Sequence, residues 1–260
     1  MIDFKNIKRL TLKVGTSTLT YETGKLNFKR LDELARVLSD IQNRGIKVVL
    51  VTSGAIGVGA GKLAFEKKPE TVQEKQAAAA IGQLELMTIY DKLFSQYGQT
   101  IAQVLLTKDI IEDGQRRENV LNTFEKLLEY GVIPVINEND TVSTEEIEFG
   151  DNDRLSAVVA ELTKSELLII LTDTDGLFNK NPREHADAQL IPVVREITPE
   201  IVECAKAAGS KFGTGGMASK ISAAQTALGA GVPVVITNGG EVNNIFDILD
   251  GKQTGTVFIN

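Results

Sequence analysis

Two lysines and three glycine-rich segments are the residues of this sequence best suited to binding phosphate. Lys220 ends the stretch KFGTGGMASK at 211–220, and Lys13 lies two residues before GTST at 15–18; the third segment is SGAIGVGAG at 53–61. Glycine has no Cβ, so the backbone can approach an anion and several N–H groups can point at it together. The first stretch is not a P-loop, which requires lysine directly after a glycine. The segments predict an anion site, although a tight turn would explain any one of them.

Two clusters of Asp and Asn offer a complementary set of groups. Asp151, Asn152 and Asp153 directly precede an apolar helical run, and NEND occupies 137–140. One Asp or Asn would suffice to cap a helix. The others could bind an amino group, orient lysines or lie near a metal-bound nucleotide. Lysines, phosphate-binding loops and carboxylates are the groups that phosphoryl transfer needs, because that reaction depends on positioning and charge neutralisation.

The elements that position these residues follow from hydrophobic periodicity. Strands are expected at 10–14, 46–52, 100–106, 132–136, 166–172 and 232–237. Helices are expected at 30–44, 71–96, 116–130, 153–163, 198–207 and 217–229. Almost wholly apolar strands that alternate with helices predict an α/β fold, a single three-layer αβα sandwich with a mainly parallel central sheet. Such sheets bind ligands at the carboxyl ends of their strands, which is where the polar segments lie.

Composition excludes several classes of protein. The 260 residues are 42% hydrophobic and 24% charged, as expected for one large α/β domain or two small ones. The net charge of −7 argues against a nucleic-acid partner. One histidine (His185) and one cysteine (Cys204) argue against a Ser–His triad or a structural zinc site, and exclude an intrachain disulfide. Neither a membrane span nor a secretory signal is present, so a cytoplasmic protein is expected.

Taken together, six segments resemble the amino acid kinase family: LKVGTST, SGAIGVG, NENDTV, FGDND, LTDTDGLF and GTGGMASK. The resemblance covers essentially the whole chain. It implies one kinase domain at 1–260, without the C-terminal RNA-binding-like (PUA) domain that many members carry. It also implies transfer of the γ-phosphoryl group of ATP to the side-chain carboxylate of L-glutamate, the first step of proline biosynthesis. Mg²⁺ on the ATP phosphates, feedback inhibition by proline and a homodimer or homotetramer are further implications.

The same resemblance assigns roles to individual residues. The catalytic residues would be Lys13 and Lys220, which neutralise the transferred group, and Asp153, which orients them. Glutamate would be bound by Ser53, Gly54, Asp140 and Asn152. ATP would be bound by Lys13, Gly15, Thr172, Asp173, Thr214, Gly215, Gly216, Met217, Ala218, Ser219 and Lys220.

Three other functions remain open at this point. A family member acting on aspartate, acetylglutamate, carbamate or uridylate would share the lysines, and the pair NENDTV and FGDND favours glutamate over these acceptors. A non-catalytic sensor of amino acids or nucleotides need not keep both lysines and Asp153. A nicotinamide-dependent oxidoreductase would need a complete dinucleotide fingerprint, which SGAIGVG lacks.

Overall fold

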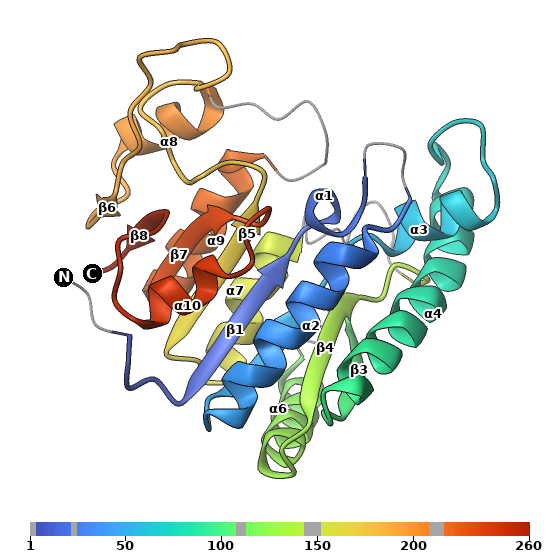
Figure 1. Cartoon of the computed structure of the whole chain (residues 1–260). Helices are drawn as coiled ribbons and strands as arrows, with labels where there is room; N and C mark the ends of the chain where they lie inside the picture. The colour runs from blue at the N-terminus through green and yellow to red at the C-terminus, as the bar shows by residue number, and fades with distance from the viewer. Residues whose placement is uncertain (1–3, 22–24, 108–112, 143–151, 208–215) are drawn as a thin grey trace. The chain divides into compact units, whose positions relative to one another are not determined.

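The computed structural model describes residues 4–21, 25–107, 113–142, 152–207 and 216–260. The chain divides into two compact units (Figure 1). Unit 1 consists of Met1–Val14 and Gly150–Asn260, and unit 2 is Gly15–Phe149. Among the described residues, no helix is both long and apolar enough to cross a membrane.

The part of unit 1 that the structure describes contains five strands. Their order is β1 (Arg9–Val14), β5 (Leu167–Thr172), β7 (Val234–Asn238), β8 (Thr256–Phe258) and β6 (Val193–Val194). The first three are parallel to one another, β8 is antiparallel to β7, and β6 is parallel to β8. Every residue of β5 is buried, as expected for a strand that is covered on both faces.

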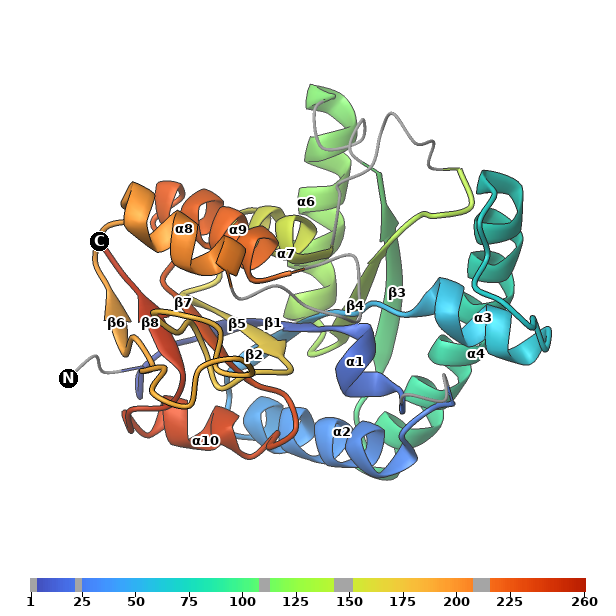
Figure 2. The same ribbon diagram turned by 90° about the horizontal axis from the view of Figure 1, so that it is seen from above.

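Helices cover both faces of the unit 1 strands. They are α7 (Asn152–Leu162), α8 (Pro199–Ala207), α9 (Met217–Gly229) and α10 (Asn244–Leu249). Figure 2 shows α7, α8 and α9 on one face and α10 on the other. Small buried residues, among them Ala157 and Ala160 of α7 and Ala223 and Ala224 of α9, belong to the core in which these two helices pack together.

The segment between Leu177 and Ile191, called the excursion, leaves the strands of unit 1 after β5. Its two ends are held together by the hydroxyl of Thr256 and by a backbone hydrogen bond. Thr256 Oγ1 accepts a hydrogen bond from the Leu177 N–H at 2.8 Å and donates one to the Ile191 carbonyl at 2.7 Å. The Ile191 N–H also bonds the Leu177 carbonyl at 2.8 Å. Gly176 makes this approach possible, because a Cβ at its φ of +152° would lie 2.6 Å from the same hydroxyl oxygen.

The described residues of unit 2 form three parallel strands and five helices. The strand order is β3 (Ile101–Leu106), β4 (Ile133–Glu138) and β2 (Lys47–Val51). The helices are α1 (Thr16–Leu19), α2 (Phe28–Asn43), α3 (Ala55–Lys62), α4 (Val72–Gln96) and α6 (Gly114–Glu129). Helices α2 and α4 pack together, and α6 lies on β4 at the opposite face (Figure 2).

The backbones of α3 and α4 are in direct contact at two glycines. A Cβ on Gly82 of α4 would lie 1.8 Å from the Ala55 carbonyl oxygen and 2.5 Å from the Gly59 nitrogen. A Cβ on Gly59 of α3 would lie 1.8 Å from the Ala78 carbonyl oxygen. The prediction that SGAIGVGAG is an anion-binding loop is therefore wrong beyond Gly54: Gly57 and Gly59 are helical, and Gly59 serves helix packing.

The predicted α/β fold with mainly parallel strands is confirmed. All six predicted strands and all six predicted helices occur, with ends that differ by no more than two residues. The strand-like stretch TVFI at the end of the chain is β8, and the elements of the described residues that were not predicted are short or glycine-rich: α1, α3, α10 and β6.

Candidate functional site

A buried carboxylate in unit 1 holds two lysines. Lys13 lies one residue before the end of β1, and its Nζ is 2.6 Å from Oδ1 of Asp153. Lys220 lies in the first turn of α9, and its Nζ is 3.0 Å from Oδ2 of the same carboxylate. The exposed fractions are 3% for Lys13, 4% for Lys220 and 0% for Asp153. Charges this deeply buried are tolerated only when they are paired, so the cluster is a built arrangement.

The local sequence explains why Asp153 is at this position. It is the second residue of α7, where a carboxylate is favoured by the helix dipole. The apolar residues Leu155, Val159 and Leu162 of α7 are buried. The start of α7 therefore faces the same buried region as the end of β1, and Asn152, partly buried, is the first residue of the helix.

The N-terminus of α9 joins this cluster. Gly216 precedes the helix in an extended conformation and provides no side-chain cap for the first N–H groups. The Ser219 hydroxyl is 2.6 Å from Asp153 Oδ2 and 2.8 Å from the Gly216 carbonyl oxygen. A lysine in the first turn is disfavoured by the helix dipole, so Lys220 gains from the carboxylate beside it. Backbone N–H groups at helix starts are suited to bind anions, and here those groups include the N–H of Met217 and of Ala218.

Two other residues predicted to bind the nucleotide lie at the end of β5. Thr172 is the buried last residue of the strand, and its hydroxyl is 3.2 Å from Asp173 Oδ1. Partial burial opposes ionisation of Asp173, but the hydrogen bond from Arg183 Nη2 at 2.7 Å, with backbone and hydroxyl donors, outweighs it and lowers the pKa of the carboxyl. Arg183 was not predicted from the sequence, since it lies ten residues further along an irregular segment.

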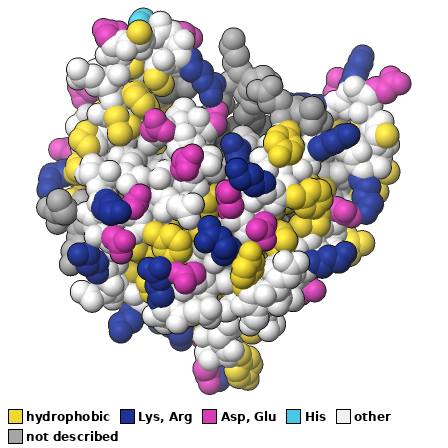
Figure 3. Space-filling view, in the orientation of Figure 1, with side chains coloured by type: hydrophobic (Ala, Val, Ile, Leu, Met, Phe, Trp, Pro, Cys, Tyr) yellow, Lys and Arg dark blue, Asp and Glu magenta, His cyan; other side chains and the backbone are white. Residues whose placement is uncertain are grey.

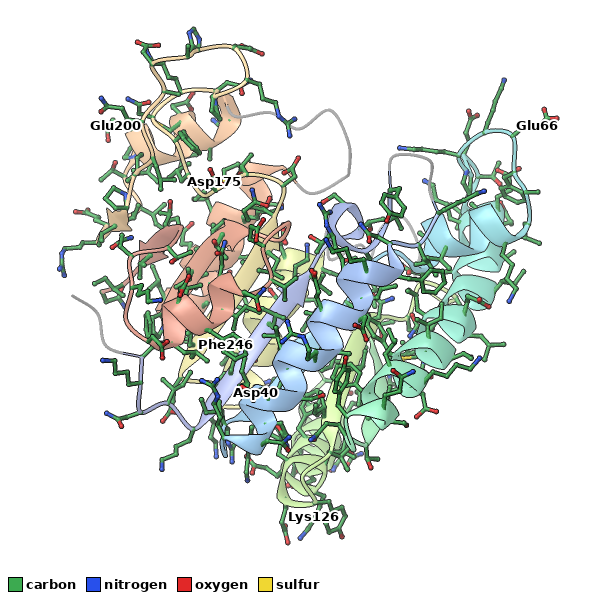
Figure 4. All side chains as sticks on the ribbon, viewed as in Figure 1. Asp40, Glu66, Lys126, Asp175, Glu200 and Phe246 are labelled. Carbon is green, nitrogen blue, oxygen red and sulfur yellow. The ribbon has the colours of Figure 1, made fainter. Side chains whose placement is uncertain are left out.

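The ends of β5 and β7 are tied together. The Gly239 N–H donates to the Thr172 carbonyl at 2.7 Å, and Asn238 Nδ2 donates to Asp175 Oδ1 at 2.8 Å. Figure 4 labels Asp175 on the segment that follows β5. The expectation that polar residues after these parallel strands lie along one edge is confirmed within unit 1. Thr214 and Gly215 lie outside the described residues.

Unit 2 contains Gly15, Ser53 and Gly54. Gly15 precedes α1, and Gly54 precedes α3 with a φ of +98°. A Cβ on Gly54 would be 3.5 Å from Thr16 Cγ2, so the starts of α1 and α3 lie side by side. Ser53 is buried between Gly54 and the end of β2. The left-handed conformation at Gly54 is one that other residues rarely adopt.

Asp140 lies in the turn after β4 and is partly buried. In that turn the Val142 N–H donates to the Asn139 carbonyl at 3.1 Å. Ser53, Gly54 and Asp140, predicted to bind glutamate, thus follow strands β2 and β4 of unit 2. Asn152, predicted with them, belongs to unit 1.

His185 and Cys204 were judged from the sequence to be unsuited to a Ser–His triad or a zinc site. They belong to other elements than Lys13, Asp153 and Lys220. His185 is exposed in the irregular segment between β5 and β6. Cys204 is partly buried in α8, with its Sγ 3.4 Å from the Asn179 carbonyl. Basic and acidic side chains are interspersed over the face drawn in Figure 3. Interactions between exposed charges that lie more than about 8–10 Å apart are largely screened at physiological salt.

Three comparisons with known proteins identify what the chain resembles. The model of the amino acid kinase family matches residues 8–238. A protein of Clostridium perfringens named glutamate 5-kinase is 53% identical over 259 residues, with 98% of this chain and 96% of that protein covered. A protein of Listeria innocua with the same name is 52% identical, with 98% and 94% covered.

Solved structures share the fold. Isopentenyl phosphate kinase of T. acidophilum, solved as a product complex, superposes with a TM-score of 0.69 at 19% identity, covering 96% of this chain and 99% of that one. UMP kinase of Bacillus anthracis gives 0.66 at 18% identity, covering 97% and 96%. At these identities the likeness concerns the fold alone.

Proposed function

The chain belongs to the amino acid kinase family, and we propose that it transfers the γ-phosphoryl group of ATP to the side-chain carboxylate of L-glutamate, with Lys13, Lys220 and Asp153 as its catalytic residues. The substrates and reaction follow from relatives about half identical over nearly the full chain. The observation that supports the catalytic assignment is an ion-pair cluster. The buried carboxylate of Asp153 pairs with the buried ammonium groups of Lys13 and Lys220.

The chemistry suits this arrangement. A glutamate side chain is already ionised near neutral pH, so one carboxylate oxygen can attack the γ-phosphorus without a general base. The new P–O bond gives an acyl phosphate, and the bond to the β-phosphate oxygen breaks as ADP leaves. Negative charge moves along the line of transfer, and Lys13 and Lys220 stabilise it where it develops. Asp153 holds both ammonium groups in position.

The nucleotide role is assigned to other residues of unit 1 as well. The N–H groups at Gly216, Met217, Ala218 and Ser219 would bind phosphate oxygens at the start of α9. Thr172 and Asp173 would lie along the nucleotide, with Asp173 kept ionised by Arg183. Thr214 and Gly215 keep the role that the resemblance gives them, as does Gly15 at the start of α1.

The acceptor role is assigned to Ser53, Gly54, Asp140 and Asn152. Asp140 suits the ammonium group of glutamate by charge, whereas Asn152 and Ser53 suit its carboxylates by hydrogen bonding. Mg²⁺ would accompany ATP, bound by phosphates and water as this ion prefers. Inhibition by proline, a homodimer or homotetramer and a cytoplasmic location complete the proposal.

The test is an assay of ATP consumption by the purified protein with Mg²⁺. The acceptors are L-glutamate, L-aspartate, N-acetyl-L-glutamate, UMP and carbamate, and hydroxylamine is added to trap an acyl phosphate. Turnover with L-glutamate that yields the hydroxamate is expected. Turnover with another acceptor alone would overturn the roles given to Asp140 and Asn152, and no turnover with any acceptor would favour the sensor.

A further inference from the structure

A buried amide pair in unit 2 joins α4 to the end of β4. Asn137 Nδ2 donates a hydrogen bond to Gln83 Oε1 at 2.8 Å. The exposed fraction is 8% for Gln83 and 1% for Asn137. Asn137 comes one residue before the end of β4 and three before Asp140. Neither side chain of this pair has a role in the proposed mechanism so far.

The backbone determines which atom of each amide is oxygen. The N–H of Glu138 can only donate, and it lies 2.9 Å from Oδ1 of Asn137. The other Asn137 atom is therefore the NH₂ group, which must face an acceptor, and that acceptor is Oε1 of Gln83. The remaining atom of Gln83 is thus Nε2, a donor.

Nε2 of Gln83 is buried and has no hydrogen-bond partner in the described part of the chain. Native proteins rarely leave a buried N–H group without an acceptor, since its lost hydration is not replaced. A well-placed exception indicates a group that is completed by water or by a bound molecule. Because Nε2 cannot accept, its partner must carry an acceptor atom.

Gln83 lies close to the chain segments that carry three of the residues assigned to the acceptor substrate. Its neighbour Gly82 touches the backbone of Ala55, the first residue after Ser53 and Gly54. The Thr52 N–H bonds the Ile136 carbonyl at 2.9 Å, which brings the end of β2 beside the end of β4. Gln83 itself contacts Asn137, three residues before Asp140, and its neighbour Gly82 contacts α3 directly after Ser53 and Gly54.

We infer that Gln83 Nε2 donates a hydrogen bond to a carboxylate oxygen of bound L-glutamate, with Asn137 orienting its amide group. The inference rests on the proposed function. Glutamate offers one ammonium group, which only donates, and two carboxylates, which only accept, so a donor-only atom selects a carboxylate. Asp140 would then bind the ammonium group of glutamate, and Gln83 would bind one of its carboxylates.

The decisive variant is Gln83→Glu. It keeps the length of the side chain and the oxygen that accepts from Asn137, and replaces the donor nitrogen by an oxygen. KM for L-glutamate should rise about tenfold to a hundredfold, the usual loss for a hydrogen bond to a charged group, and KM for ATP should change less than about twofold. Gln73→Glu is the matched control, because Gln73 is exposed on the same helix.

A pH series separates recognition from a structural effect. At low pH the introduced carboxyl becomes protonated and its O–H can donate, so the ratio of the variant KM to the wild-type KM should fall as pH is lowered. If Gln83→Glu does not fold, Gln83→Met at the same length is used, and the same selective rise in KM for L-glutamate is expected.

Unchanged KM for L-glutamate in a folded variant would overturn the inference in favour of water as the partner of Nε2. A rise in KM for ATP alone would assign the donor to the nucleotide and also overturn it. If the wild-type protein does not phosphorylate L-glutamate, the proposed function itself fails, which is a separate result.

Discussion

The substitution Gly82→Ala tests whether the contact between α3 and α4 is as close as described. The added Cβ would lie 1.8 Å from the Ala55 carbonyl oxygen, whereas ordinary contact begins at 3.4 Å, so the helices must separate by about 1.6 Å. Overpacking of this kind costs about 1–3 kcal/mol, offset by up to about 1 kcal/mol for replacing a helical glycine. We expect a net loss near 2 kcal/mol, or a Tm lower by about 4–8 °C.

The matched control is Gly57→Ala. Gly57 lies in α3, and its Cβ would meet only Thr16 Cγ2, at 3.8 Å. This variant should therefore be neutral or more stable by up to about 1 kcal/mol. Urea and thermal unfolding of both variants measure the difference, and KM for L-glutamate should rise only for Gly82→Ala, because α3 begins directly after Gly54. Equal stability of the two variants would refute the close packing.

Three further predictions concern the assigned roles. Lys220→Ala should give a folded protein whose kcat is lower by about 10²- to 10³-fold. The control Lys206→Ala, at an exposed lysine of α8, should leave kcat unchanged. A near-normal kcat for Lys220→Ala would show that Lys220 is not a catalytic residue. Gly54→Ala should lower the free energy of unfolding by about 1–2 kcal/mol, since φ is +98°, and urea unfolding that matches wild type would contradict this strain. The pKa of Asp173 is lowered, so its ionised form favours the folded state above the ordinary pKa and this contribution is lost as pH falls through the folded value. Arg183→Gln should therefore reduce the fall in Tm below about pH 4, and identical Tm–pH curves would show that the pair is not coupled.

The fold was largely predictable because its strands are so apolar. A run such as that of β5 can be accommodated only between two layers of helices, which predicts parallel strands with their polar ends along one edge. The two-residue β6 and the antiparallel pairing of the strand-like stretch TVFI (β8) were not predicted, because both depend on contacts distant in the sequence.

The candidate site was predictable where a residue type was out of place. Lys13 inside an apolar strand and Lys220 at a helix start are both unexpected positions for a cation, and both lie at Asp153. Gln83 could not be found in this way, because a glutamine in a helix is ordinary. What distinguishes it is burial beside Asn137, which depends on how α4 meets the end of β4 in the folded chain. The glycines of α3 were misread for a similar reason, since a loop and a close helix crossing both require glycine.

The closed base of the excursion between Leu177 and Ile191 has a consequence for engineering. Because Thr256 and the backbone pair hold its two ends, the chain between them is attached to unit 1 independently of its length. An inserted reporter or affinity peptide placed beside the exposed His185 would extend the excursion without changing the spacing of β5 and β8. The hydroxyl of one threonine thereby makes this segment a natural attachment point for labels, as long as Arg183 stays within reach of Asp173.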